Sequence, residues 1–480
     1  MDSIVEFKGL NEHASIDDNE LSDCHNISME EYPSLSSRCG YEVFDNFDLG
    51  SPSQGIKAYG IQGKTMITDK YDNFAMTHDV SAYLARVGQE PDKKTIYSGT
   101  SEEYDLYGCC NYNGVLTIFQ GTRESMGMTV PKIVVYENWN SPQYIELTGL
   151  LGIGTIGVNN SFLLSFGSRL IIVKENEIHI SFDNDISADK WQEYQINGVG
   201  TAECAQEIQI TDDGYFTGCI NYRDYPVFFK ENSMYILYGE YNPFSLSRID
   251  TIGCICPKTI AICNGSLYFL SKLGVMEYNG GTPKLISQNI KLDTSAAAYG
   301  IYDSACADNR YYYIGDYIFD TYSRTWGKQM IPNPDTASEE SIRIRPQCYF
   351  DGKVYVTGNL LENVGGQPPY DRPTLYRSDQ DALTEWSFTT KLFHEYLAGK
   401  KLLSKIIIGF EKAGTQSLKI EVSLDKKEFS AIYEWDGTTD FVKEVPVIFP
   451  PSDTFQIRVS GKGQTLIHYL KRIYRILGEW

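Results

Sequence analysis

The sequence has no apolar run long enough to cross a membrane and no paired motif of metal-binding residues. Its 480 residues contain no stretch of about 18 apolar residues, and the N-terminus has no basic region followed by an apolar run. We therefore expect neither a transmembrane helix nor a cleavable leader. The six His are scattered, and none lies in HExxH or HxH. No residue is therefore assigned as a metal ligand.

Signatures of common catalytic and nucleotide sites are also missing. No GxSxG elbow occurs, and the Gly-rich residues 149–157 lack the GK[ST] ending of a phosphate-binding loop. Glycosidases on propeller folds use converging carboxylates. With 63 Asp and Glu in the chain, some pair is always available, and none stands out by its spacing. We expect no catalytic residues, no metal and no cofactor.

Positive charge is scarce. The chain has 42 Lys and Arg against 63 Asp and Glu, which gives a net charge of −21. Proteins that bind bare DNA usually present a basic field, so sequence-specific recognition of nucleic acid is not expected. The excess acid lies before residue 392, since residues 392–480 carry 13 Lys and Arg against 11 Asp and Glu. An acidic surface would repel a phosphate backbone that passes nearby.

Cysteine does not form a recognisable framework. The 11 Cys are odd in number and scattered, and no CxxC occurs. This pattern favours small buried hydrophobic residues in a reducing compartment over a disulfide scaffold.

A strand–turn–strand phrase occurs twice. VKENEIHISF (173–182) recurs as FKENSMYILYG (229–239), 56 positions later. In both copies, alternating apolar residues follow Lys-Glu-Asn. Strand repeats of this period are typical of stacked β-units such as propeller blades, which cannot bury their faces alone. His179 takes the position of Tyr235 in the repeat, so we expect it to pack within a strand.

The composition and the turn signals predict the fold class. Aromatic residues make up 13% of the chain, which favours sheets over helices. Asn-Gly and Asp-Gly pairs mark hairpins, and strand pairs recur about seven times at spacings of roughly 35 to 55 residues. After about Phe393, short regular strands alternate with charged turns, as in an antiparallel sandwich. We predict an all-β protein in which residues 41–392 form a β-propeller of about seven blades and residues 393–480 form a C-terminal β-sandwich.

The first forty residues have a different character. Asp, Asn, Ser and Pro dominate, with single apolar residues between them. We predict that residues 1–40 form an extended N-terminal arm with local turns, held by a few apolar side chains.

A short basic run near the C-terminus is a second candidate contact. It consists of Lys471, Arg472 and Arg475. These residues would contact an acidic neighbour, either a loop of another protein or the acidic arm of an adjacent copy. The alternative is a solvated strand face.

A set of phrases carries a resemblance to a known family. FKGLN, NELSDCHNIS, YPSL and Arg38 occur within residues 7–38, followed by FFKENSMYILYG (228–239) and IGCICPKTIAICNGSLYFLSKLGVMEYNGG (252–281). Together with DTFQIRVSGKGQTLIHYL (453–470), they resemble bacteriophage virion proteins of the tail or neck. The set is similar to the propeller-bearing tail accessory, or packaged-DNA stabilisation, proteins of short-tailed phages.

The resemblance implies a non-enzymatic structural protein of a phage virion, assembled in the bacterial host cytoplasm. Such proteins attach below the portal or along the tail tube, usually as a ring of copies, and form part of the DNA conduit that keeps packaged DNA in place. The implied partners are other virion proteins (portal, adaptor or tail tube) and copies of the same chain, with no membrane. The resemblance also implies that the N-terminal arm, too polar to fold alone, becomes ordered against neighbouring subunits. Its anchors and assembly contacts would be the apolar residues Phe7, Leu10, Leu21, Ile27 and Leu35. Two alternatives remain: a receptor- or glycan-binding tail component, because aromatic faces stack on sugars, and a propeller glycoside hydrolase.

Overall fold

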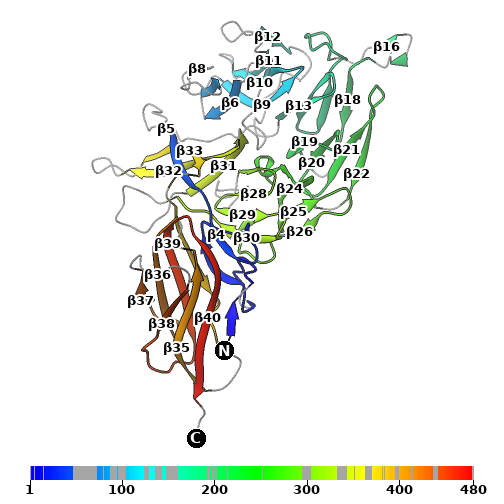
Figure 1. Cartoon of the computed structure of the whole chain (residues 1–480). Helices are drawn as coiled ribbons and strands as arrows, with labels where there is room; N and C mark the ends of the chain where they lie inside the picture. Colours follow the sequence, from blue (N-terminus) through cyan, green and yellow to red (C-terminus); the bar gives the residue numbers. More distant parts are fainter. Residues whose placement is uncertain are drawn as a thin grey trace.

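The computed structural model describes residues 2–46, the strands and adjoining residues between 73 and 147, and residues 161–477, with gaps inside these ranges that include 295–303, 332–342, 363–369 and 436–441. Every regular element of the described part is a strand, apart from the 3₁₀ turn η2 (Pro257–Thr259). The all-β prediction is confirmed. Figure 1 shows two lobes: the middle of the chain forms the upper one, and the two ends of the chain meet in the lower one.

The lower lobe is a sandwich of two antiparallel sheets. One contains β3 (Ile27–Ser28), β4 (Leu35–Ser37), β40 (Leu466–Leu477), β35 (Lys400–Phe410) and β38 (Val442–Pro446) in that order, with β1 (Asp2–Ile4) also paired to β40. The other contains β2 (Leu21–His25), β34 (Glu385–Thr390), β39 (Phe455–Gly463), β36 (Thr415–Leu424) and β37 (Ser430–Glu434). The sandwich therefore includes β34, which lies before the predicted boundary at residue 393.

The N-terminal segment (residues 2–38) is part of this sandwich and not an extended arm. Strands β1 and β4 pair with β40, and β2 pairs with β34, so the segment adds strands to both sheets. The physical reason is that isolated apolar residues in a polar segment can still complete a sheet. An unpaired sheet edge exposes backbone N–H and C=O groups that a short strand satisfies. Local polarity could not show that a partner edge for this segment lies in the same chain.

The upper lobe, here called the propeller region (residues 40–379), consists mainly of antiparallel meanders. Six of its described sheets have four strands. In chain order the first three comprise β9 (Tyr104–Tyr112), β10 (Val115–Arg123), β11 (Thr129–Val135) and β12 (Gln143–Glu146); β13 (Ser161–Phe166), β14 (Arg169–Lys174), β15 (Glu177–Ile180) and β18 (Gln206–Gln209); and β19 (Gly218–Tyr222), β20 (Tyr225–Phe229), β21 (Met234–Tyr238) and β22 (Ser245–Ile249).

The remaining sheets of the propeller region follow the same plan. They comprise β23 (Ala261–Cys263), β24 (Ser266–Ser271), β25 (Gly274–Tyr278) and β26 (Lys284–Leu285); β27 (Ala305–Ala307), β28 (Tyr311–Ile314), β29 (Tyr317–Asp320) and β30 (Thr325–Lys328); and β31 (Arg343–Phe350), β32 (Lys353–Glu362), β33 (Tyr370–Asp379) and β5 (Gly40–Asn46). Two smaller sheets contain β6 (Asn73–His78), β7 (Ser81–Arg86) and β8 (Lys94–Thr95), and β16 (Gln195–Ile196) with β17 (Val199–Gly200).

Strand β5 joins the beginning of the propeller region to its end. It precedes every other strand of the region in sequence, yet it pairs with β33, the last one. An early strand that completes the final sheet ties the two ends of the region together, as in closed propellers. The six four-stranded sheets and the three-stranded sheet β6–β8 suit the expected repeat. A ring of seven blades stays a prediction.

The two Lys-Glu-Asn turns link neighbouring sheets. Lys230, between β20 and β21, is fully buried, and its Nζ donates to Asn176 Oδ1 of the preceding turn at 3.4 Å and to the Ile210 carbonyl at 2.8 Å. Lys272, in the next sheet, donates in the same way to Asn232 Oδ1 at 3.4 Å. The repeat thus specifies contacts between successive sheets as well as the strands themselves.

Candidate functional site

The junction between the sandwich and the propeller region contains the residues to which the sequence pointed. Phe7, Leu10, Leu21, Ile27 and Leu35, predicted as anchors, are all at most 4% exposed. They belong to one apolar cluster that also contains sandwich residues such as Phe388 and propeller residues such as Tyr312. The structure therefore brings all five together, but inside this chain's own core. As outward-facing contacts with another subunit, they were predicted wrongly.

Asn26 is the polar centre of the junction, and the sequence analysis did not single it out. Its backbone N–H donates to the Lys328 carbonyl at 2.7 Å, and its Oδ1 accepts from the Met330 N–H at 2.8 Å. Its Nδ2 donates to the carbonyls of Met330 and of Glu385 in the sandwich, at 2.9 and 2.8 Å. One side chain therefore bonds both regions. The only signal in the sequence was an Asn between two short stretches of alternating apolar residues. Asn is enriched at turn positions with a positive φ, which Asn26 adopts.

Glu12 is a second junction residue that the sequence analysis missed. Its carboxylate accepts from Lys328 Nζ at 2.5 Å, from the Lys291 N–H at 2.7 Å and from Tyr317 Oη at 2.9 Å. Burial alone would raise the pKa of Glu12, but the bonds from Lys328 and Lys291 outweigh it and hold the pKa below the usual range. The pKa of the partner Lys328 shifts in the opposite direction. Burial alone would lower the pKa of Lys328, but the bond to Glu12 outweighs this effect and raises it.

The basic run on β40 divides into three different environments. Arg472 is 2% exposed and pairs with Asp18 of the N-terminal segment at 2.8 Å. Lys471 is half-buried, with its Nζ 4.7 Å from the centre of the Tyr469 ring, and Arg475 is exposed. The expected acidic partner is therefore present for Arg472, but it belongs to the same chain and not to an adjacent copy.

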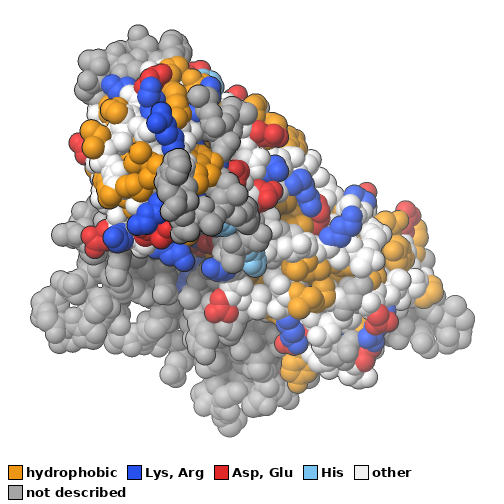
Figure 2. Space-filling model, turned by 90° about the horizontal axis from the view of Figure 1, so that it is seen from below, with side chains coloured by type: hydrophobic (Ala, Val, Ile, Leu, Met, Phe, Trp, Pro, Cys, Tyr) orange, Lys and Arg blue, Asp and Glu red, His pale blue; other side chains and the backbone are white. Residues whose placement is uncertain are grey.

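Asp18 also contacts Lys391, so it accepts from two cations. Burial raises the pKa of Asp18, but Lys391 and Arg472 together bring the pKa below its ordinary value. In the view from below, Lys and Arg side chains form a row over one lobe beside hydrophobic side chains (Figure 2).

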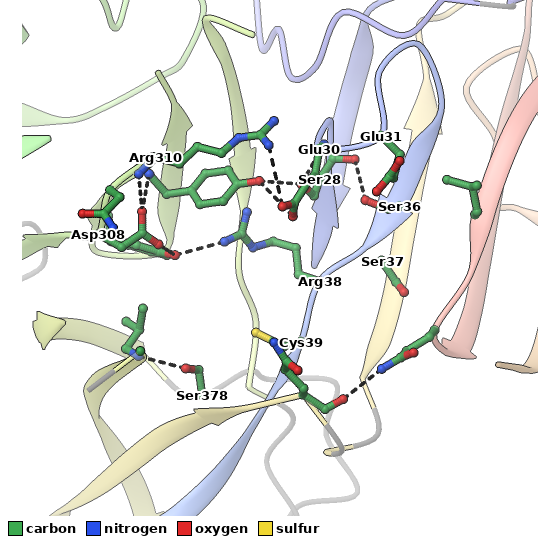
Figure 3. Close-up of a pocket in the computed structure, with 18 of the residues that line it drawn as sticks. Ser28, Glu30, Glu31, Ser36, Ser37, Arg38, Cys39, Asp308, Arg310 and Ser378 are labelled. Carbon is green, nitrogen blue, oxygen red and sulfur yellow. Dashed lines mark hydrogen bonds and ion pairs between the residues drawn. The ribbon is translucent and has the colours of Figure 1, made fainter. Parts of the chain in front are cut away.

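A cavity of about 710 Å³ opens at this junction, between the N-terminal segment, the sheet β27–β30, the sheet β31–β33 and the sandwich (Figure 3). Its centre is Arg38, whose guanidinium carbon lies 4.2 Å from the centre of the Tyr311 ring and whose Nη2 donates to Tyr313 Oη at 3.1 Å. Tyr313 Oη in turn donates to Asp308 Oδ2 at 2.9 Å. The aromatic rings therefore hold the Arg38 guanidinium in one orientation.

The carboxylates of the cavity are mostly occupied by bonds within the protein. Asp308 Oδ1 accepts from the N–H groups of Arg310 and Tyr311 at 2.7 and 2.5 Å. Glu30 lies 3.6 Å from Arg310, whose guanidinium also makes a bidentate pair with Asp320.

Within the described residues, no group of three His, Cys, Asp or Glu is placed to hold a metal ion. In the same part of the chain, no helix has the length and apolar character needed to span a bilayer.

Two further predictions concern single segments. Residues 149–157, which we predicted not to form a phosphate-binding loop, lie outside the described residues. His179 is buried within β15, as predicted for a packing residue.

No family model and no curated protein matches the chain. Several solved structures show a distant similarity to the chain. Raptor from Chaetomium thermophilum is 11% identical over 71% of this chain, with a TM-score of 0.40, and the match covers only 30% of Raptor. An exo-β-1,3-galactanase from Phanerochaete chrysosporium is 8% identical, with a TM-score of 0.30, covering 91% of this chain and 99% of that one.

The extracellular domain of a hybrid two component system from B. thetaiotaomicron is 10% identical, with a TM-score of 0.42, covering 97% of this chain and 63% of that one. At these identities and TM-scores, the likenesses carry no argument about activity.

Proposed function

We propose that this chain is a non-enzymatic structural protein of a phage virion, located in the tail or neck, where copies of it form part of the DNA conduit and stabilise packaged DNA. The proposal starts from the resemblance of its sequence phrases to propeller-bearing tail accessory proteins. Its partners would be the portal, adaptor or tail tube and further copies of the chain.

The observation that carries the proposal is the position of the N-terminal phrases FKGLN, NELSDCHNIS and YPSL. Phe7 and Leu21 lie in the apolar cluster that joins the two regions, and Asn26 bonds both of them. Residues of the N-terminal phrases thus lie where the two regions meet. A conduit protein must keep its parts in fixed positions against the pressure of packaged DNA, and this arrangement suits that task.

The charge of the chain is compatible with the same role. A net charge of −21 would disfavour tight contact with the phosphate backbone, so DNA could pass an acidic surface without being retained on it. Sequence-specific binding of DNA would need a basic surface instead.

The test is the position and the effect of the protein in particles. We expect a gold label on this chain to appear at the neck or tail in electron micrographs, and particles assembled without the chain to lose packaged DNA. Supplying the unaltered chain during assembly should restore DNA retention. The proposal is wrong if particles lacking the chain retain DNA and infect normally, or if the label never joins a particle.

A further inference from the structure

The cavity around Arg38 has the features of a ligand site for which the proposed role has no use. We propose that it binds a neutral saccharide of about one to three sugar rings. Its volume of about 710 Å³ lies in the range of small-molecule sites. Residues from three parts of the fold line it: the N-terminal segment, the propeller region and the sandwich loop that contains Gln464 (Figure 3). The inference does not depend on a role in a virion.

The first reason is the fixed guanidinium. Arg38 has one face on the Tyr311 ring and one N–H bonded to Tyr313, and no ion pair joins it to a carboxylate of the described residues. A guanidinium carries five N–H donors in a rigid plane, so several remain to meet acceptors on a ligand. Vicinal hydroxyl oxygens present pairs of acceptors at a spacing that such a plane can meet.

The second reason is the balance of charge, which disfavours an anionic ligand. The lining contains four carboxylates, those of Glu30, Glu31, Asp308 and Glu411, against two guanidiniums. The whole chain is also acidic, at −21. A phosphate or a carboxylate ligand would approach against this field, whereas a neutral polyol would meet acceptors and donors without repulsion.

The third reason is the set of exposed neutral groups on the walls. Asn309, Gln380 and Gln464 are exposed and offer amide donors and acceptors. Tyr349 is 37% exposed and presents an aromatic ring to the same space. An amphipathic ring beside amide groups matches a sugar, which has an apolar face and a rim of hydroxyls.

The experiment is calorimetric titration of the full chain with a fixed panel of neutral sugars, namely maltose, lactose, cellobiose and N,N′-diacetylchitobiose. Glucuronate and N-acetylneuraminate form the acidic arm. We expect saturable binding of at least one neutral sugar below about 10 mM and weaker or no binding of the acids.

Variants locate the site. Y349A and R38M should each weaken binding at least about tenfold, because one removes the ring and the other the donors. Y322A is the matched control, because Tyr322 is 63% exposed and lies outside this cavity. A thermal melt of each variant checks folding. If R38M is unstable, Y349A still tests the site, because Tyr349 is a surface residue and its removal should leave the fold intact.

Three results would overturn the proposal. The first is no saturable binding of any neutral sugar in the panel. The second is binding of the acidic sugars alone, which would place the ligand in another class. The third is binding that Y349A leaves unchanged, which would place the sugar elsewhere on the protein.

Discussion

Asn26 has a positive φ of 53° and lies in the short turn between β2 and β3. Asn adopts this conformation more readily than most residues because its short side chain bonds locally. Here that side chain turns to the backbone of both regions instead. A single residue therefore satisfies backbone groups that follow β30 of the propeller region and a carbonyl of β34 in the sandwich, which no apolar side chain could do.

We expect N26A to destabilise the protein by about 3 kcal/mol, because it removes three hydrogen bonds of a buried side chain and leaves partly buried backbone groups of Met330 and Glu385 without these partners. Denaturant unfolding followed by intrinsic fluorescence measures the change. N309A is the control, since Asn309 is exposed and should change stability by less than about 0.5 kcal/mol. Equal stability of N26A and the unaltered protein would contradict the assignment of Asn26 as the polar centre.

Lys230 and Lys272 make equivalent bonds in different surroundings. Lys230 is 0% exposed, whereas the side chain of Lys272 is 51% exposed and pairs with Glu231 at 2.8 Å. We expect K230M to lower the unfolding free energy by about 3 kcal/mol, because it removes a fully buried ammonium that bonds the Ile210 carbonyl. We expect K272M to lower it by less than about 1 kcal/mol, because surface pairs contribute little. Unfolding free energies of the two variants, measured under the same conditions, test this difference. A larger loss in K272M would show that exposure does not govern the contact.

At the scale of elements, the N-terminal segment behaves as a set of added strands. β1 and β4 cover neighbouring stretches of the same β40 edge, at Leu470–Arg472 and at Leu466–Ile467. β2 covers the edge of β34 in the facing sheet. The segment thus protects one edge of each sheet, which would otherwise be open to pairing with another chain.

We expect amide hydrogens of residues 21–28 and 35–37 to be protected from exchange in the isolated protein, because these strands are paired and their apolar side chains are buried. Hydrogen exchange with mass spectrometry of peptides covering this range measures it. Exchange as fast as in a free peptide would instead support the extended arm that was predicted from the sequence.

Strand β40 offers a matched pair of substitutions three residues apart. R472M removes a buried guanidinium that holds Asp18 and lies 3.8 Å from the centre of the Phe393 ring. R475M changes an exposed side chain on the same strand. We expect R472M to lower the unfolding free energy by about 3 kcal/mol and R475M to leave it within about 0.5 kcal/mol. Similar values for the two would contradict the structural role given to Arg472.

At the scale of the whole molecule, the two regions share an apolar cluster and a set of ion pairs, so we expect them to unfold together. The pair Glu12–Lys328 connects the N-terminal segment to β30 at 2.5 Å. The pKa of Glu12 is lowered by folding and that of Lys328 is raised. Each shift makes the charged pair a source of stability over a defined range of pH.

The sign of the pH effect follows from these two shifts. A carboxyl whose pKa is depressed in the folded state contributes stability above its unfolded pKa, about 4.3 for Glu, and loses it as the pH falls through the folded value. A Lys whose pKa is raised contributes below its unfolded value, about 10.4, and loses it as the pH rises further. The pair therefore stabilises the fold between about pH 4.5 and pH 10.

We expect E12Q to melt at a lower temperature than the unaltered protein at pH 7, with the difference shrinking as the pH falls below about 4. Melting curves of both proteins across this range provide the measurement. E20Q is a suitable control because it changes a carboxylate of the same segment that bonds only within the segment. A difference in melting temperature that grows as the pH falls would contradict the lowered pKa of Glu12.

Much of the fold could be read from the chain in advance because its signals are local. Alternating apolar residues, Asn-Gly turns and the Lys-Glu-Asn repeat each act within a few residues, and they led to an all-β architecture with meander sheets and a terminal sandwich. The Lys-Glu-Asn repeat even marked a site of contact between sheets, although the partner of Lys230 could not be inferred from sequence spacing.

The candidate cavity could not be predicted, because its walls come from residues more than 400 positions apart, such as Arg38 and Gln464. No local pattern relates a residue in a polar N-terminal stretch to a loop before the last strand. The same distance hid the partner of Arg472, whose acidic contact was foreseen but assigned to another molecule.

The sequence by itself determined the class of structure, since strand-forming residues and turn residues alternate along almost the whole chain. Only the tertiary structure decided that residues 2–38 belong to the sandwich, that the predicted anchors are core residues and that a polar cavity opens beside Arg38. The physical reason is that burial and pairing depend on which distant edges meet in space, and a local pattern shows that a segment needs a partner without identifying it.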